Sequence, residues 1–232
     1  MKAGIIAAGE GSRLKSEGIT VPKPLVEVNG VPLIERLLRS FIRSGISEVV
    51  CIINEESREV KRFVEERDLN IPVRFVVQST PSSMHSLFAL APHLIDGRFL
   101  LSTVDPVFDD TEFSRFLEYA QQRKNADGVL AVTSFIDDEN PLYVQLDASR
   151  RIRGFSKSDR MKWVTGGLYF FSPGIFKEVK NVLNQRIERL RNFLAYLVQH
   201  GYVLEGFAFS KIVDVDHVQD IQTAESLLRG RG

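Results

Sequence analysis

Five short apolar runs, separated by stretches with helical spacing, constrain the fold of this 232-residue chain more than any other feature. Each run is rich in β-branched or aromatic residues and is of strand length. The runs are Ala3 to Ala7, Glu48 to Ile53, Val73 to Val77, Arg98 to Ser102 and Gly128 to Thr133. This alternation predicts an α/β protein, an α/β/α sandwich with a mixed, mostly parallel central sheet. Ligands of such sheets bind beyond the carboxyl ends of the strands.

The intervening stretches support this prediction, because their apolar residues recur on one helical face. Leu33, Leu37 and Phe41 form such a stripe, and Phe113 and Phe116 belong to another. After about residue 135 the pattern changes, and the segments PLYVQLD, RIRGFSKS and WVTGGLYFFS are typical of antiparallel additions to the sheet. Two further helical segments and a closing helix follow, and we expect a single domain over residues 1–232.

The balance of charges, the lengths of the apolar runs and the cysteine content each exclude or disfavour a class of binding partner or site. Thirty Lys plus Arg residues balance thirty Asp plus Glu, so the chain lacks the overall positive field that non-specific binding to nucleic acid requires. No apolar run reaches the length of a membrane span or of a signal-peptide core, which predicts a cytoplasmic protein without membrane insertion. The single cysteine, Cys51, excludes an intrachain disulfide and disfavours a cysteine-based metal site.

A glycine-rich stretch, AAGEGSRL, follows the first predicted strand. It is neither a dinucleotide loop, since Leu14 stands in place of the third glycine, nor a P-loop, since no Gly-Lys-Ser/Thr follows. Backbone N–H groups near Gly9 and Gly11 suit a phosphate, and the Arg13 guanidinium suits its oxygens. Lys23, held stiffly between two prolines, suits a second phosphate. We predict a polyphosphate site; the alternative is a tight turn with solvated charges.

Acidic residues follow two predicted strands at the expected binding edge. Asp105 comes directly after an apolar run, and Asp214 and Asp216 lie in the late segment KIVDVD. Mg²⁺ prefers one or two carboxylates together with phosphate oxygens and water, so these acids predict a magnesium site. The alternative for Asp105 is a strand-end cap. The sequence does not choose between Asp214 and Asp216, which share a face if the strand continues.

Two polar segments remain ambiguous. In QSTPSSMHSL, Gln78 offers both a donor and an acceptor to a nucleobase, whereas Ser82 or Ser83 suits a helix N-cap. In the later segment, Lys157 and the pair Gly166-Gly167 suit a second phosphate, or a β-bulge beside a solvated lysine.

Together these residues resemble the nucleotidyltransferase family that activates sugar 1-phosphates and related alcohol phosphates. The family loop G-x-G-[ST]-R-L…P-K-P matches AAGEGSRL and Pro22-Lys23-Pro24, and the resemblance spans almost the whole chain. It implies a Rossmann-like, GT-A-like fold with a nucleotide-binding part at about 1–135, an acceptor-binding part at about 136–216 and a closing helix at 217–232. It also implies these roles: catalytic Arg13 and Lys23; nucleotide-binding Ala8, Gly9, Gly11, Ser12, Gln78 and Ser83; acceptor-binding Lys157 and Gly167; and Mg²⁺ ligands Asp105 with Asp214 or Asp216.

The departures from the family pattern concern the substrates. The turn after Gln78 reads SSMHSL, the family's E-K-P is Ser156-Lys157-Ser158, and Gly-Asp is Val104-Asp105. We call residues 78–87, which include Gln78, the base loop. Its serine and histidine residues resemble those of the cytidylyltransferase branch that uses phosphocholine-like acceptors. No β-helical or regulatory domain follows in this sequence, which resembles the short, single-domain form of the family.

The implied reaction is attack by an acceptor phosphate on the α-phosphorus of a nucleoside triphosphate, with pyrophosphate leaving. A non-catalytic nucleotide sensor is one rival. A glycosyltransferase is another, although its usual Asp-x-Asp is replaced by Val104-Asp105-Pro106. The base, the acceptor and the oligomeric state, with a homodimer among the options, stay open.

Overall fold

Strands and helices alternate through the N-terminal part of the computed structural model, which describes residues 1–137 and 139–229. The predicted strands are confirmed to within one residue: β1 Lys2–Ala7, β4 Glu48–Ile53, β5 Val73–Val77, β6 Phe99–Thr103 and β8 Gly128–Thr133. The helices between them are α2 Leu33–Arg43, α3 Arg58–Glu65, α4 Ser83–Leu94 and α5 Asp110–Gln122. Asp109 caps α5 by accepting a hydrogen bond from the backbone N–H of Glu112.

The predicted antiparallel additions are also confirmed, as β9 Tyr143–Leu146, β10 Ile152–Ser156 and β11 Trp163–Phe171. They are followed by a 3₁₀ helix, Pro173–Glu178, by α6 Val179–Asn184 and α7 Leu190–Gln199, by β12 Leu204–Phe209, and by α8 Val218–Arg229. The predicted closing helix corresponds to α8, and its positions 230–232 lie outside the described residues, as does position 138 of the predicted acceptor part. None of the described helices is long and apolar enough to cross a membrane.

The strands form one nine-stranded sheet with the order β10-β9-β11-β6-β1-β4-β5, to which β8 and β12 are joined through β11. β1, β4, β5 and β6 are parallel, β12 is parallel to β8, and β11 is antiparallel to its three neighbours. The loops that follow β1, β4, β5 and β6 therefore meet at one edge. This confirms the predicted fold class.

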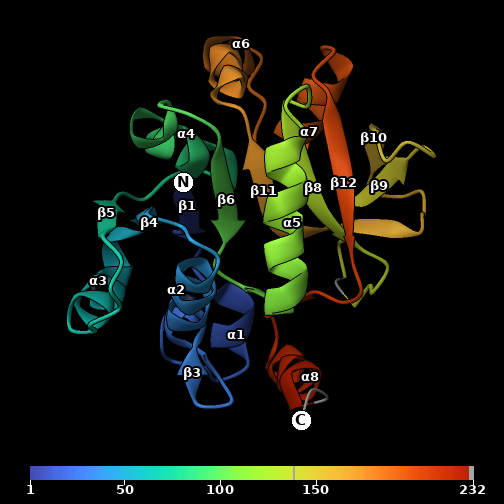
Figure 1. Ribbon diagram of the computed structural model, residues 1–232. Helices are drawn as coiled ribbons and strands as arrows, with labels where there is room; N and C mark the ends of the chain where they lie inside the picture. The colour runs from blue at the N-terminus through green and yellow to red at the C-terminus, as the bar shows by residue number, and fades with distance from the viewer. Residues whose placement is uncertain (138, 230–232) are drawn as a thin grey trace.

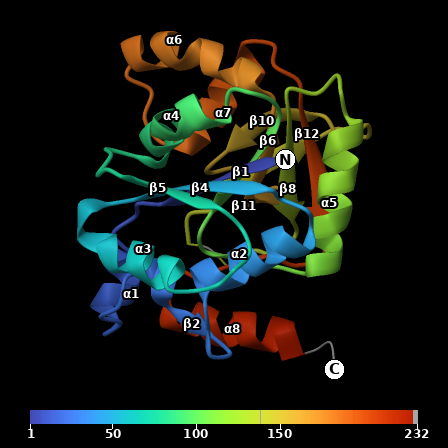
Figure 2. The same cartoon turned by 60° about the vertical axis from the view of Figure 1, so that its left-hand side comes forward.

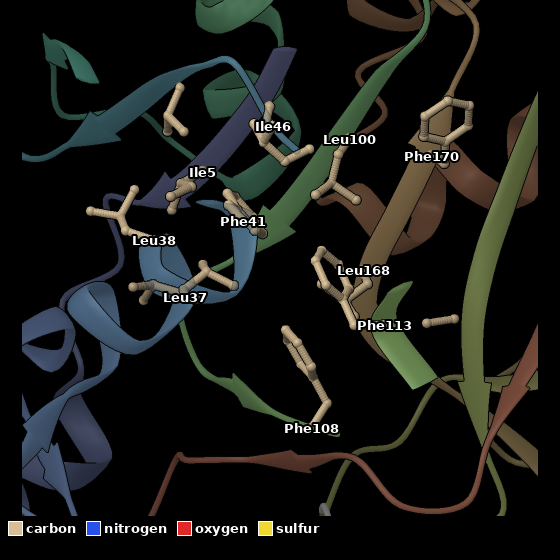
Figure 3. Close-up of a cluster of buried hydrophobic side chains, with 14 of the residues drawn as sticks. Ile5, Leu37, Leu38, Phe41, Ile46, Leu100, Phe108, Phe113, Leu168 and Phe170 are labelled. Atoms are coloured by element: carbon tan, nitrogen blue, oxygen red, sulfur yellow. The ribbon is translucent and has the colours of Figure 1, made fainter. Parts of the chain in front are cut away.

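Helices cover both faces of the sheet, because successive strand residues point to opposite sides. Ile5 packs with α2, α3 and α5, whereas its neighbour Ile6 packs with α4 and α7. Figure 2 shows α4, α6 and α7 on one side of the sheet and α2 and α3 on the other. Figure 3 shows the hydrophobic core that contains Ile5, on the α2, α3 and α5 side of the sheet. In it, Phe41 of α2 and Phe113 of α5 point toward strand residues Ile5 and Leu100.

A third, smaller core holds the glycine loop and the late acidic segment together. It combines residues of α1 Ser12–Ser16, of the hairpin strand β2 Glu27–Val28, of β7 Pro106–Val107, of β13 Val213–Asp214 and of α8. In Figure 1, α8 lies below the sheet near α1 and the second hairpin strand β3 Val31–Pro32. β13 pairs antiparallel with β7, and Val215 donates a backbone hydrogen bond to the carbonyl of Asp105 over 3.1 Å. This pairing brings residues 105 and 214–216 side by side.

Candidate active site

The glycine loop connects β1 to α1 and requires glycine at position 11. Gly11 has φ 61° and ψ 34°, in the left-handed region that glycine adopts without strain. A Cβ atom at Gly11 would also lie 3.1 Å from the Cβ of Lys23, so the loop and the Pro-Lys-Pro segment pack directly on each other. The two halves of the sequence motif are thus one structural unit.

Lys23 is the centre of the charged cluster. Its Nζ donates to Oδ2 of Asp105 over 2.5 Å and also donates to Oδ1 of Asp216. The Lys23 side chain is only 10% exposed and that of Asp105 19%. Burial by itself would lower the pKa of Lys23, but the charges of the two carboxylates raise the pKa above its usual value. For Asp105 the effects are reversed: burial by itself would raise its pKa, but the charge of Lys23 and a hydrogen bond from Thr103 lower the pKa below its usual range.

Arg13 joins the same cluster from α1. Its Nη1 donates to Oδ2 of Asp216 over 2.8 Å, so that Asp216 accepts from two cations. The backbone N–H groups of Asp216 and His217 in turn donate to the Asp220 carboxylate, which fixes this turn. Two cations therefore compensate two acids, and each bonded pair is more than 80 residues apart along the chain.

The structure places Asp214 and Asp216 in different surroundings. β13 ends at Asp214, so the strand continuation that would put both acids on one face does not occur. Asp216 contacts Arg13 and Lys23. Asp214 instead lies beside Gly167 and Tyr169, and its charge, after burial itself, raises the pKa of Tyr169. Asp105, Asp214 and Asp216 all line one cavity.

The donor set suits a hard divalent cation. Oδ2 of Asp105 and Oδ1 of Asp216 contact the same ammonium group, so these two oxygens already converge on one positive charge. Within the residues that the structure describes, no group of three or more His, Cys, Asp or Glu side chains forms a protein-only metal site. A pair of carboxylates completed by phosphate oxygens and water is the usual arrangement for Mg²⁺, so the residues present fit this ion.

Two cavities meet at this cluster. The larger, of 680 Å³, contains Ala8, Gly9 and Ser12 of the glycine loop, Lys23, and residues 79–83. The smaller, of 210 Å³, lies under β11 and is lined by Gly166, Gly167, Asp214 and Asp216 among others. Ser83, Thr103 and Asp105 line both cavities. A third cavity, of 270 Å³, surrounds Gly11, Arg13 and Lys23.

Gly167 marks a β-bulge in β11 as well as the wall of the smaller cavity. The pairing of β11 with β8 shifts register between Thr165 and Tyr169. Gly167 has φ 71°, and a Cβ there would lie 2.7 Å from Oγ1 of Thr103 and 3.5 Å from Oδ1 of Asp214. The β-bulge interpretation of this glycine pair is therefore confirmed, whereas its role in binding a second phosphate stays a prediction.

Gln78 and Lys157 lie outside these three cavities. Gln78 is exposed after β5, and its backbone N–H donates to the carbonyl of Ile53. Lys157 is exposed on a bend after β10, at the far edge of the sheet. Their roles in base and acceptor binding stay predictions.

The side chains of Ser82 and Ser83 form hydrogen bonds to a different helix from the one they were predicted to cap. Ser82 is the N-cap residue of α4, but neither serine makes a side-chain cap to that helix. Instead, Oγ of Ser82 accepts from the backbone N–H of Arg189, and Oγ of Ser83 accepts from that of Leu190, each over 3.2 Å. The N-cap prediction is right about the position and wrong about the hydrogen bond, since both hydroxyl groups accept from the N-terminus of α7 instead.

Among the residues that line the cavities, sequence reasoning missed the polar side chains of Asn54, Arg189 and Arg191. Asn54 follows β4 and bonds the carbonyl of Ala8 over 3.3 Å, so its place at a strand end was a usable signal. Arg189 and Arg191 lie at the start of α7. Nothing in the segment RIERLRNF separates them from arginines on a solvated helix.

Comparison with known proteins agrees with this geometry. Mannose-1-phosphate guanyltransferase of Hypocrea jecorina is 27% identical over 221 residues, which cover 89% of this chain and 59% of that protein. The bifunctional IPC transferase and DIPP synthase of Rubrobacter xylanophilus is 27% identical over 235 residues, covering 98% and 52% respectively. The chain thus spans between about half and two thirds of the length of the curated relatives it matches.

Solved structures share the fold. The inositol-1-phosphate CTP transferase from T. maritima has a TM-score of 0.84 and 21% sequence identity, and the match covers 99% of this chain and 96% of that one. The family model described as "Nucleotidyl transferase" matches residues 2–230. The chain therefore belongs to the nucleotidyl transferase family.

Proposed function

We propose that this protein transfers a nucleoside monophosphate from a nucleoside triphosphate to a sugar 1-phosphate or a related alcohol phosphate, releasing pyrophosphate, in a Mg²⁺-dependent reaction. One observation carries the proposal: Lys23, Arg13, Asp105 and Asp216 form a compensated charge cluster where two cavities meet. A cluster at such a junction can act on two phosphorylated substrates at once.

The chemistry requires charge and positioning rather than a general base. A phosphate oxygen of the acceptor forms a bond to the α-phosphorus, and the bond from that phosphorus to the pyrophosphate oxygen breaks. A phosphate monoester is already a competent nucleophile, so no group of the protein needs to remove a proton. Arg13 and the glycine loop stabilise the leaving pyrophosphate, and Lys23 exchanges a carboxylate partner for the α-phosphate.

Asp105 with Asp216 or Asp214 would hold Mg²⁺. Enzymes of this family generally use a divalent metal ion, and bound Mg²⁺ supplies positive charge to the phosphate oxygens. Among the described residues that line the three cavities, six acids (Glu10, Glu56, Asp105, Asp137, Asp214 and Asp216) face four cations (Arg13, Lys23, Arg189 and Arg191). This excess of carboxylates suits a divalent cation that enters with the triphosphate.

The identity of the substrates is tested by a two-dimensional panel. Each of the four common nucleoside triphosphates is combined, in Mg²⁺, with mannose, glucose or inositol 1-phosphate or with phosphocholine, and pyrophosphate release is followed. We expect one base and one acceptor class to dominate. Phosphocholine as the preferred acceptor would assign the chain to the cytidylyltransferase type.

The same assay separates the proposal from its rivals. Binding of a triphosphate without pyrophosphate release for any pair would contradict the proposal and support a nucleotide sensor. Consumption of a nucleotide sugar in the absence of triphosphate would support a glycosyltransferase. Matched Asp214→Asn and Asp216→Asn variants, titrated with Mg²⁺, identify the second ligand as the acid whose loss raises the Mg²⁺ concentration needed for half-maximal rate.

A further inference from the structure

Arg189 and Arg191 flank a single anchored residue at the start of α7. Leu190 between them is buried, at 4% exposure. Arg189 lines the larger cavity, on the triphosphate side of the cluster, and Arg191 lines the smaller one. One short turn therefore places an arginine at the wall of each of the two cavities.

The backbone of this turn is held in a conformation that arginine rarely adopts. Arg189 has φ 67° and ψ 140°, which costs roughly 1–3 kcal/mol for a residue other than glycine. Hydrogen bonds from its N–H to Ser82 and from the N–H of Leu190 to Ser83 fix the turn against the base loop. Such strain persists only where the surrounding structure enforces it, and it gathers at functional sites.

The two guanidinium groups form few direct contacts with the described residues. The Arg189 guanidinium forms no hydrogen bond or ion pair with the part of the chain that the structure describes. Arg191 donates from Nη1 to the carbonyl of Asn140 over 3.3 Å, and a guanidinium group carries further donors besides this one. Arg13 and Lys23, by contrast, are already paired with acids.

We propose that Arg189 and Arg191 form a two-arginine clamp, in which Arg189 binds the triphosphate and Arg191 binds the phosphate of the acceptor. The proposal rests on the proposed function and adds substrate-binding residues to it. Two anions must approach each other for the reaction, and their repulsion falls when each faces a cation on the same rigid turn. A planar guanidinium also binds two phosphate oxygens at once.

The clamp also accounts for the exposed position of Lys157. In the family pattern that this sequence resembles, the lysine of E-K-P contacts the second phosphate, and here that motif reads Ser156-Lys157-Ser158. Arg191 lines the smaller cavity, whereas Lys157 lies outside it. The acceptor phosphate is therefore bound from α7 rather than from β10.

Steady-state kinetics with the best substrate pair test the clamp. Arg189→Gly should raise the KM for the triphosphate about 10- to 100-fold, the size expected for a lost charge-assisted hydrogen bond, with the acceptor KM within about twofold. Arg191→Ala should do the reverse. Arg189→Gly should also melt at the same temperature or higher, because glycine relieves the strained backbone.

Arg186→Gly is the matched control. Arg186 is an exposed arginine of the same segment, also has a positive φ, 53°, and lines none of the three cavities. Its removal should leave both KM values unchanged. Wild-type KM values in Arg189→Gly and Arg191→Ala would overturn the clamp, as would a larger increase in acceptor KM in Lys157→Ala than in Arg191→Ala.

Calorimetric binding of pyrophosphate and of inorganic phosphate separates the clamp from the proposed function. Weaker pyrophosphate binding by Arg189→Gly and weaker phosphate binding by Arg191→Ala, each relative to Arg186→Gly, support the clamp even if no substrate pair is turned over. Unchanged binding of both anions in a protein that is active contradicts the clamp and leaves the proposed function intact.

Discussion

The two cavities of the site are built in different ways. The larger cavity, which we propose binds the triphosphate, takes part of its lining from one local segment, residues 6–24, in which Gly11 and Lys23 pack on each other twelve residues apart. The acceptor side gathers residues of β6, β8, β11, β13 and the start of α7. On the first side, Arg13 and Lys23 are already paired with acids, whereas on the second side the Arg191 guanidinium donates to the backbone carbonyl of Asn140.

This difference indicates a division of labour. A local motif with paired charges keeps the same geometry whatever lies around it, which suits a triphosphate common to many acceptors. A wall assembled from several elements can change with each of them, which suits the variable substrate. Substitutions of the paired cations on the first side should therefore lower turnover with every acceptor, and those on the second side should change the binding of the acceptor.

Lys23→Met should produce the largest effect. It removes the cation shared by Asp105 and Asp216 and leaves a mostly buried carboxylate without its partner. We expect a loss of about 3 kcal/mol of unfolding free energy and of roughly 100-fold or more in turnover, measured by urea unfolding and pyrophosphate release. In Lys23→Met/Asp105→Asn, stability should recover in part while activity does not; recovered activity would contradict the role of Lys23.

Gly167→Ala should be next and should affect the acceptor side. The positive φ alone disfavours alanine by about 1–2 kcal/mol, and the new Cβ would also press on Oγ1 of Thr103 at 2.7 Å. We expect a higher acceptor KM with little change in triphosphate KM. Gly45→Ala is the control, since Gly45 has φ 75° with no atom within 4 Å of its Cβ position. Equal destabilisation in both variants would show that close packing at Gly167 is unimportant.

The contribution of Asp105 to the free energy of unfolding should depend on pH, because its carboxylate must be charged to pair with Lys23. The pKa of Asp105 is lowered in the folded state, so its charge stabilises the fold at any pH above its ordinary pKa of 3.8. This stabilisation is lost as the pH falls through the lower pKa of the folded state. The wild type should therefore exceed Asp105→Asn in unfolding free energy at pH 7, with the difference shrinking below about pH 4. A difference that stays constant with pH would contradict the ion pair.

Glu17→Gln should have the smallest effect. Glu17, at the end of α1, accepts from Nδ1 of His217 and from the backbone N–H of Val218, which ties the glycine loop to the turn carrying Asp216. The hydrogen bond to Glu17 raises the pKa of His217, so its contribution is complete below pH 6.5 and is lost as the pH rises through the folded value. The wild type should melt slightly higher than Glu17→Gln at pH 6, and the difference should narrow by pH 8.

Much of the fold followed from local patterns in the sequence. The strands of a mostly parallel sheet are short, largely apolar runs, which is why the limits of β4, β5 and β8 were predicted to the residue. The order of the strands is a different matter. The position of β11 between β6 and β8 depends on which edges remain open after the parallel strands have paired, and no local pattern records this.

The site divides in the same way. The sequence by itself determined the glycine loop, Lys23 beside it and an acid at the end of β6, because backbone conformation and strand ends are local properties. Only the tertiary structure decided that Asp216 rather than Asp214 contacts Arg13 and Lys23, and that Arg189 and Arg191 rather than Lys157 line the cavities. Those contacts join residues from opposite ends of the chain, and their distances are set by the pairing of β13 with β7 and by the packing of α7 against the base loop.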